Sequence, residues 1–191
     1  AWLEGWGADD CLHRLLGLSP SLVAISINIA NAREGLALSR KIKERAGSVP
    51  VVIGGPFASC LPARSLERSA ANAVVVGEGE AVIAELVQRS GAGPEAWKGL
   101  PGLQLSGQKV PVAAQRAREL DQLAFPSYRA FPDLNRYRCR ARWKPVGWLL
   151  TSRGCPCHCS FCDKSVFPGP CFFHSAGRVL EEIGRWERDY G

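Results

Sequence analysis

Four cysteines are crowded between Cys155 and Cys162, half of the eight that the chain contains. Cys155, Cys159 and Cys162 follow the spacing C-x3-C-x2-C, and Cys157 is a spare thiol between them. Thiolates this close on a tight loop can converge on one face of an iron–sulfur cluster, and both such clusters and zinc prefer thiolate ligands. Three protein ligands on a four-iron cluster would leave one iron open to an exogenous ligand. The segment therefore predicts a metal centre.

Two other interpretations of these cysteines remain open. Cys159 and Cys162 form one pair at C-x2-C spacing, and Cys171 and His174 form a second pair at the same spacing. Together the two pairs would make a Cys3His zinc site that stabilises a small binding module. The other alternative is a non-catalytic relative that keeps an iron–sulfur cluster for electron transfer. Alanine at Cys155 separates zinc from iron, because the proposed zinc site does not use this thiol.

Basic residues alternate with other types between residues 136 and 144. In an extended segment a period of two places all of them on one face. We favour a solvated strand edge protected by charge, because no interleaved aromatic array or known nucleic-acid motif accompanies the run. The net charge of +6 does not by itself favour nucleic acid as a partner. The basic residues are Arg136, Arg138, Arg140, Arg142 and Lys144.

Length and composition exclude several classes of protein. A chain of 191 residues that is 46% apolar and 22% charged is typical of one or two globular domains. No apolar run approaches the ~18 residues of a membrane span. No signal segment is recognisable at the start, so we expect a cytoplasmic protein with reduced cysteines. The chain contains no Met and begins at Ala1, from which we expect a processed or cut N-terminus.

Upstream of the cysteines, short apolar runs alternate with amphipathic stretches. The runs are residues 22–27, 51–53 and 74–76, and a helical pattern covers residues 34–45. Runs without polar alternation are typical of strands buried on both faces, so we predict an α/β fold with a parallel sheet between helices. Only three strands are visible, and we expect the missing ones to precede Ala1. The next helical pattern is carried by Val82, Ile83, Leu86 and Val87.

Small and polar residues follow each of these three strands. In parallel sheets, ligands bind beyond the carboxyl ends of the strands, so this edge is the candidate ligand site. The alternative for the glycines is that they only turn the chain. The residues on the candidate edge are Ser26, Asn28, Gly54, Gly55, Gly77 and Glu78.

Three regions follow from the patterns. Residues 1–95 are the α/β domain, residues 96–145 are a linker with a small hairpin and an extended basic segment, and residues 146–191 are a second unit. In that unit we predict a strand at residues 146–151, then the cysteine loop, then a helix capped by Ser175. The helix would have an apolar stripe made of Val179, Leu180, Ile183 and Trp186.

The segment from Arg153 to Cys162 resembles the signature loop of the radical S-adenosylmethionine superfamily. That resemblance implies that Cys155, Cys159 and Cys162 hold a four-iron, four-sulfur cluster whose fourth iron is chelated by S-adenosylmethionine. Phe161 takes the place of the aromatic residue that packs near the adenine. It also implies that residues 146–191 begin a (β/α) barrel.

The rest of the chain resembles the cobalamin-binding subgroup of that superfamily, whose N-terminal part is a Rossmann-like B12 domain. The similar segments are 24–27, 52–56, 76–80, 101–103 and 120–126. The resemblance implies cobalamin as a further cofactor. Residues implied to line the pocket for its nucleotide tail are Ser26, Asn28, Gly54 and Gly55, with Gly77 and Glu78 nearby.

The resemblance also implies an activity. Reductive cleavage of S-adenosylmethionine gives a 5′-deoxyadenosyl radical that abstracts hydrogen from a substrate, with methyl transfer or ring rearrangement as onward chemistry. An electron donor such as flavodoxin or ferredoxin is implied as partner. No residue is assigned a catalytic role, and the substrate is not indicated. Because residues 146–191 are far short of the roughly 250 residues of a full barrel, the chain resembles a fragment from which we expect no turnover alone.

Overall fold

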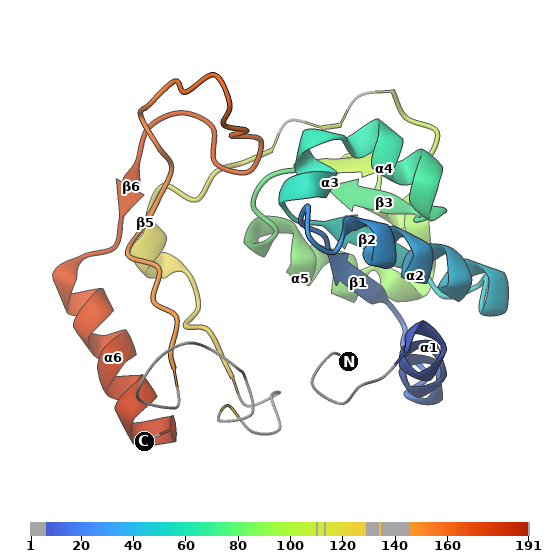
Figure 1. Ribbon diagram of the computed structural model, residues 1–191, viewed down its shortest axis with the longest axis horizontal. Coiled ribbons are helices and arrows are strands. Elements are labelled where there is room, and N and C mark those ends of the chain that lie inside the picture. Colours follow the sequence, from blue (N-terminus) through green and yellow to red (C-terminus); the bar gives the residue numbers. More distant parts are fainter. Residues whose placement is uncertain (1–6, 110, 113, 129–133, 135–145, 191) are drawn as a thin grey trace.

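The computed structural model describes residues 7–109, 111, 112, 114–128, 134 and 146–190 (Figure 1). A sheet with its helices occupies one side of the molecule, and a C-terminal arm that ends in a long helix occupies the other. The basic run at residues 136–144 lies outside the described residues. Among the described residues, no helix is both long and apolar enough to span a membrane.

The main sheet has four strands in the order β1-β2-β3-β4. They are β1 (Val23–Ser26), β2 (Val51–Gly54), β3 (Ala73–Val75) and β4 (Leu103–Leu105). The first three are parallel, as the sequence predicts, and β4 pairs with β3 in the antiparallel direction. The predicted α/β fold with a Rossmann-like parallel sheet is confirmed.

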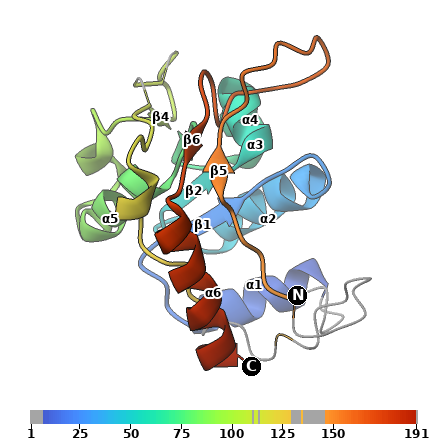
Figure 2. The same ribbon diagram turned by 90° about the vertical axis from the view of Figure 1, so that its left-hand side faces the viewer.

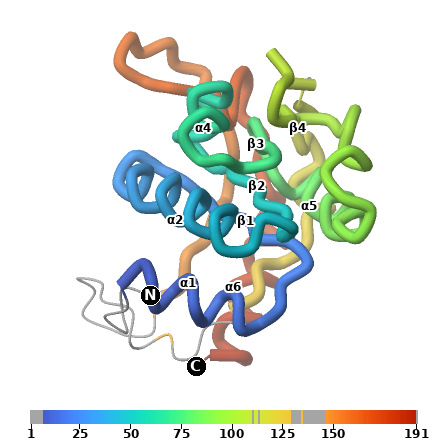
Figure 3. The backbone as a smooth tube through the Cα atoms, turned by 90° about the vertical axis from the view of Figure 1, so that its right-hand side faces the viewer, coloured from blue at the N-terminus to red at the C-terminus, as the bar shows by residue number. Residues whose placement is uncertain are grey.

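Helices cover both faces of this sheet (Figure 3). α2 (Ala32–Arg45) and α4 (Pro62–Ser69) lie over one face, and α5 (Glu80–Gln88) lies beside β4 on the other. α1 (Ala8–Gly17) packs against α2, and the short α3 (Pro56–Cys60) follows β2 directly.

The strands have two buried faces because alternate side chains enter two different hydrophobic clusters. Val51 and Ile53 pack with the α2 side, whereas Val52 between them packs with the α5 side. Val74 and Val75 are divided in the same way. This two-sided burial explains why the strands lack polar residues in the sequence.

The sheet extends past the expected domain boundary at residue 95. Trp97 and Leu100 are buried with β4 in the cluster on the α5 face. Residues that the sequence assigned to the linker therefore complete the α/β core. Among the described residues, three backbone hydrogen bonds, each 3.0 Å long, bridge the expected hairpin: one joins Gln108 to Leu105, and two join Val112 to Gly102 and Leu103.

The C-terminal arm begins as a short antiparallel pair, β5 (Ser152–Arg153) with β6 (Phe172–Phe173). α6 (Ala176–Tyr190) follows β6 and extends away from the pair (Figure 2). The predicted cap is confirmed, because the Ser175 hydroxyl accepts the Arg178 N–H at 3.2 Å. The predicted strand at 146–151 is wrong in its bounds, because strand pairing begins only at Ser152. Of the predicted segment, Thr151 accepts the His174 N–H at 2.9 Å, next to the β5–β6 pair.

Gly55 provides a direct test of how the strand ends are packed. Its φ is +90°, and a Cβ there would lie 2.7 Å from the Ile27 carbonyl oxygen. We expect Gly55→Ala to lower the free energy of unfolding by about 1–3 kcal/mol, because both the backbone strain and the overlap must be relieved. Urea unfolding followed by circular dichroism measures this.

The matched control is Gly91→Ala, where an added Cβ meets no atom within 4 Å. Its stability should stay within about 0.5 kcal/mol of the parent protein. Equal effects of the two substitutions would contradict the packing described for Gly55.

Candidate functional site

A cavity of about 570 Å³ lies at the carboxyl ends of β1, β2 and β3. Five of the six predicted edge residues line it: Ser26, Gly54, Gly55, Gly77 and Glu78. The opposite wall comes from the C-terminal arm and consists of Leu150, Arg153, Val166 and Phe167. The cavity is therefore formed by both parts of the molecule, which the sequence alone did not predict.

The glycines at this edge are required by close backbone approaches as well as by turns. Gly55 lies against the backbone of Ile27, and Gly77 has a φ of +86°. A Cβ added to Gly77 would lie 3.2 Å from the Cβ of Ala114. The Gly77 N–H also donates to the Ser59 hydroxyl at 3.1 Å. Turning the chain and lining the cavity are thus compatible roles for the same residues.

Asn28 is the predicted edge residue that does not line the cavity. Its side-chain oxygen accepts the N–H groups of Ala30 and Asn31 at 2.9 and 3.1 Å, and its own N–H donates to Asn31 Oδ1 at 2.7 Å. These bonds organise the turn that leads into α2. The predicted contact of Asn28 with a cofactor has no support from its position.

Glu78 is the buried charge of the site, with a side chain only 2% exposed. Its Oε2 accepts the Ala117 N–H at 2.9 Å and lies 3.5 Å from Nη1 of Arg153. Its Oε1 lies 3.6 Å from Nε of Arg116. Buried carboxylates need such partners, because an unpaired charge in this environment is costly. Sequence reasoning gives neither arginine a role: Arg153 is noted only as the first residue of the signature segment, and Arg116 belongs to no recognisable pattern.

The two arginines also bind groups other than Glu78. Arg153 donates to Glu80 at 2.6 Å, and Arg116 donates to the carbonyl oxygens of Pro168 and Pro170 at 2.5 and 3.0 Å. Burial acts to raise the pKa of Glu80, but the hydrogen bond and charge of Arg153 outweigh it, so this pKa is lowered.

The cysteine segment itself is exposed. Cys155, Cys157, Cys159 and Cys162 are free thiols, and Phe161 is 90% exposed. The Cys162 N–H donates to the Cys159 carbonyl at 3.1 Å, which closes a turn between these two residues.

No three potential ligands among the described His, Cys, Asp and Glu side chains lie close enough to hold a metal ion. The donor set nevertheless fits an iron–sulfur cluster by its chemistry, because three accessible thiols at this spacing are soft ligands free of disulfides. Metal binding commonly organises the ligand loop.

The alternative zinc ligands are not brought together. His174 is held by Asp121, whose Oδ1 lies 3.1 Å from its Nδ1. Its side chain is 7% exposed. Cys171 lies on the far limb of the loop, and its Cα would be 3.0 Å from a Cβ on Gly154. With Cys159 and Cys162 exposed on the loop, the described structure contains no Cys3His cluster.

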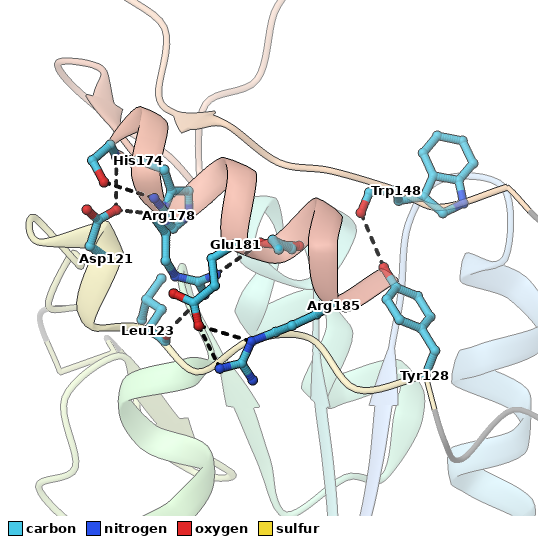
Figure 4. A network of polar contacts seen from close by, with 10 residues as sticks. Asp121, Leu123, Tyr128, Trp148, His174, Arg178, Glu181 and Arg185 are labelled. Carbon is cyan, nitrogen blue, oxygen red and sulfur yellow. Dashed lines mark hydrogen bonds and ion pairs between the residues drawn. The ribbon is translucent and has the colours of Figure 1, made fainter. Parts of the chain in front are cut away.

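A strap of residues 120–128 holds α6 in place, beginning with the short helix η4 (Leu120–Gln122) (Figure 4). Asp121 accepts the Ser175 N–H at 3.0 Å at the start of α6. Hydrogen bonds from Ser175, followed by His174, lower the pKa of Asp121. At the other end, Tyr128 packs on Trp186 with ring centroids 4.5 Å apart.

Charged groups, rather than the predicted apolar stripe, fill the centre of this contact. Arg178 donates to the Leu123 carbonyl at 3.1 Å and to Glu182 at 3.3 Å, and its guanidinium lies over the Phe125 ring. Val179 and Trp186 of the stripe are half-buried, but Leu180 and Ile183 are exposed. The predicted helix is confirmed, and the strap offers its carbonyls and aromatic rings to the face of α6 adjacent to the stripe.

Comparisons with known proteins agree with this architecture. The B12 binding domain family matches residues 5–87. The chain is 33% identical over 188 residues to an uncharacterised methyltransferase of Pyrococcus horikoshii, covering 96% of this chain and 40% of that protein. It is 29% identical over 151 residues to the cobalamin-dependent radical SAM methyltransferase TokK of Streptomyces tokunonensis, covering 76% of this chain and 22% of TokK.

The fold is also similar to a solved structure, that of the radical S-adenosylmethionine methyltransferase TsrM from Kitasatospora setae. The TM-score is 0.66 with 22% identity, over 94% of this chain and 37% of that one. The cavity, sheet and cysteine loop define a B12-binding type of α/β domain joined to a cysteine-bearing unit. The chain therefore matches the B12 binding domain family over residues 5–87, and over most of its length it is similar to a cobalamin-dependent radical SAM methyltransferase. It spans about two fifths or less of the length of the relatives named here.

Arg178 and Arg185 on α6 offer a matched pair of substitutions. Arg178 and Glu182 are 7% and 9% exposed, whereas the Arg185–Glu181 pair is 45% and 54% exposed. We expect Arg178→Met to lower the free energy of unfolding by about 3 kcal/mol, because Glu182 is left buried without its partner. Arg185→Met should cost less than about 1 kcal/mol. Denaturant unfolding of both variants is the measurement, and a reversed order would contradict the buried pair.

Proposed function

We propose that the chain is part of an enzyme that binds cobalamin in the cavity and a four-iron, four-sulfur cluster on Cys155, Cys159 and Cys162. The observation that carries this proposal is the shared cavity, because one wall comes from the B12-type sheet edge and the other from the arm that bears the cysteines. Relatives named as methyltransferases favour methyl transfer over ring rearrangement as the onward chemistry.

The cavity walls suit a large cofactor that carries both apolar and polar surface. Ile25, Val75 and Phe167 supply apolar wall, and Ser26 supplies a hydroxyl. Gly54 and Gly55 let neighbouring protein atoms approach closely at this wall, because an added Cβ would lie 3.5 Å from Val75 Cβ and 2.7 Å from the Ile27 carbonyl oxygen, respectively. We infer that these residues bind and orient the cofactor and exclude water, which is the part a protein plays in cofactor chemistry.

When bound, the cluster supplies the electron that cleaves S-adenosylmethionine into methionine and a 5′-deoxyadenosyl radical. The residues of this chain would position the cluster and S-adenosylmethionine relative to each other. Three thiolates would bind iron, and Phe161 would pack against the adenine. An exposed cysteine segment leaves access for a small protein reductant, for which a flavodoxin or a ferredoxin is our proposal.

The cysteine assignment has a sharp internal control. We expect Cys155→Ala to abolish the four-iron signal after anaerobic reconstitution with iron and sulfide, because a ligand is lost. Cys157→Ala, in the same exposed segment, should retain it. The measurement is electron paramagnetic resonance of the reduced protein with and without S-adenosylmethionine.

Either of two results would count against the cluster. Retention of the signal in Cys155→Ala would contradict the ligand set. Stoichiometric zinc that depends on Cys171 and His174 would favour the binding module instead.

Substitution of Gly54, which lines the cavity, tests cobalamin binding. We expect Gly54→Leu to weaken cobalamin at least about tenfold, because the added side chain occupies space that the ligand needs. The dissociation constant is measured by titration of the visible absorption band. Gly91→Leu, at an open surface position, should bind as the parent protein does. Unchanged affinity in Gly54→Leu would place cobalamin elsewhere.

A further inference from the structure

Glu78 has a property that lining a cavity does not require. Its buried carboxylate faces two arginines from different parts of the chain, Arg116 and Arg153. A residue that only contacted a cofactor would keep its charge free for that ligand. Here the charge is directed to the protein, and the Ala117 N–H occupies Oε2 as well.

The two arginines contact opposite limbs of the cysteine loop. Arg153 is on the near limb, two residues before Cys155. Arg116 donates to Pro168 and Pro170 on the far limb. Each guanidinium also lies over an aromatic ring of the arm, Arg153 over Phe167 at 5.8 Å and Arg116 over Phe172 at 4.7 Å. Through these two arginines, Glu78 is therefore linked to both limbs of the cysteine loop.

The network is incomplete in a specific way. Within the described residues, Oε1 of Glu78 and Nε of Arg116 are buried and have no hydrogen-bond partner. They face each other at 3.6 Å, which is too long for a hydrogen bond but close enough for strong attraction at this burial. A shift of well under 1 Å would convert the contact into a charge-assisted hydrogen bond.

We propose that Glu78 is a positioning residue that couples the occupant of the cavity to the cysteine loop. A ligand that fills the cavity presses on the strand end that bears Glu78 and on Arg153, since both line the wall. Tightening of the network then draws the limbs of the loop together. Coupling is reciprocal, so a loaded loop strengthens binding in the cavity by the same factor. This inference rests on the proposed function, which supplies cobalamin and the cluster as the two ligands.

The test compares cobalamin dissociation constants of the protein with and without its reconstituted cluster. In the parent protein we expect the cluster to tighten cobalamin by about tenfold, within the usual range of coupling between sites. In Glu78→Gln, which keeps the shape and removes the charge, we expect the ratio to fall to near one. The ratio, rather than either dissociation constant alone, is the readout, because Glu78 itself lines the cavity and its substitution alters both constants.

Glu85→Gln is the matched control, because it removes an exposed carboxylate paired with Arg89 on α5, away from the loop. Its ratio should equal that of the parent protein. Arg116→Lys serves as a second variant should Glu78→Gln fail to fold. It keeps the charge but loses the fork that lets Nε face Glu78 Oε1 while Nη2 donates to the Arg153 carbonyl and Nη1 to Pro168 and Pro170, so an intermediate ratio is expected.

The outcomes separate the inference from the proposed function. A parent protein that takes up neither cofactor overturns the proposed function, and this inference with it. A parent protein that binds both with a ratio near one overturns the inference alone. A parent-like ratio in Glu78→Gln or in Arg116→Lys overturns it too, because the carboxylate and the fork would then carry no coupling. If Glu78→Gln and Glu85→Gln lower the ratio of dissociation constants equally, the inference is also overturned.

Discussion

The buried carboxylate of Glu78 is the interaction on which the site depends. It stands at the end of β3, where the sheet ends, and its partners Arg116 and Arg153 belong to the segments that hold the cysteine loop. Removing a carboxylate and two guanidinium groups from water is costly, so each group depends on the others. The contact joins a sheet edge to a loop 75 residues later in the chain.

The sheet makes this arrangement possible because its parallel strands end at one edge. Two-sided burial gives β2 and β3 apolar residues throughout, so polar and small residues are confined to the turns that follow. Ser26 and Gly54 are the last residues of β1 and β2, Gly77 follows β3, and all three line one cavity. The α5 face is completed by Trp97 and β4, which fixes the sheet behind the cavity.

The arm is positioned by polar contacts more than by apolar ones. Asp121 and Phe125 of the strap contact the start of α6 and the guanidinium of Arg178, respectively. The ion pair of Arg178 with Glu182 is buried. A hydrophobic pattern predicts the existence of such a helix well. It does not predict which face is covered, because that depends on what the neighbouring segment offers. Leu180, in the predicted stripe, is 68% exposed in the described structure.

Sequence by itself determined the parallel α/β sheet, the edge residues other than Asn28 that line the cavity, and the cap at Ser175. It also predicts the cluster ligands Cys155, Cys159 and Cys162. These follow from local spacing and strand ends, which a linear pattern records. Only the tertiary structure decided that residues 97–105 complete the sheet, that residues 146–151 form no strand, and that Arg116 and Arg153 pair with Glu78. Strand pairing and buried ion pairs join residues distant in sequence, and their free energy depends on burial that no local pattern contains.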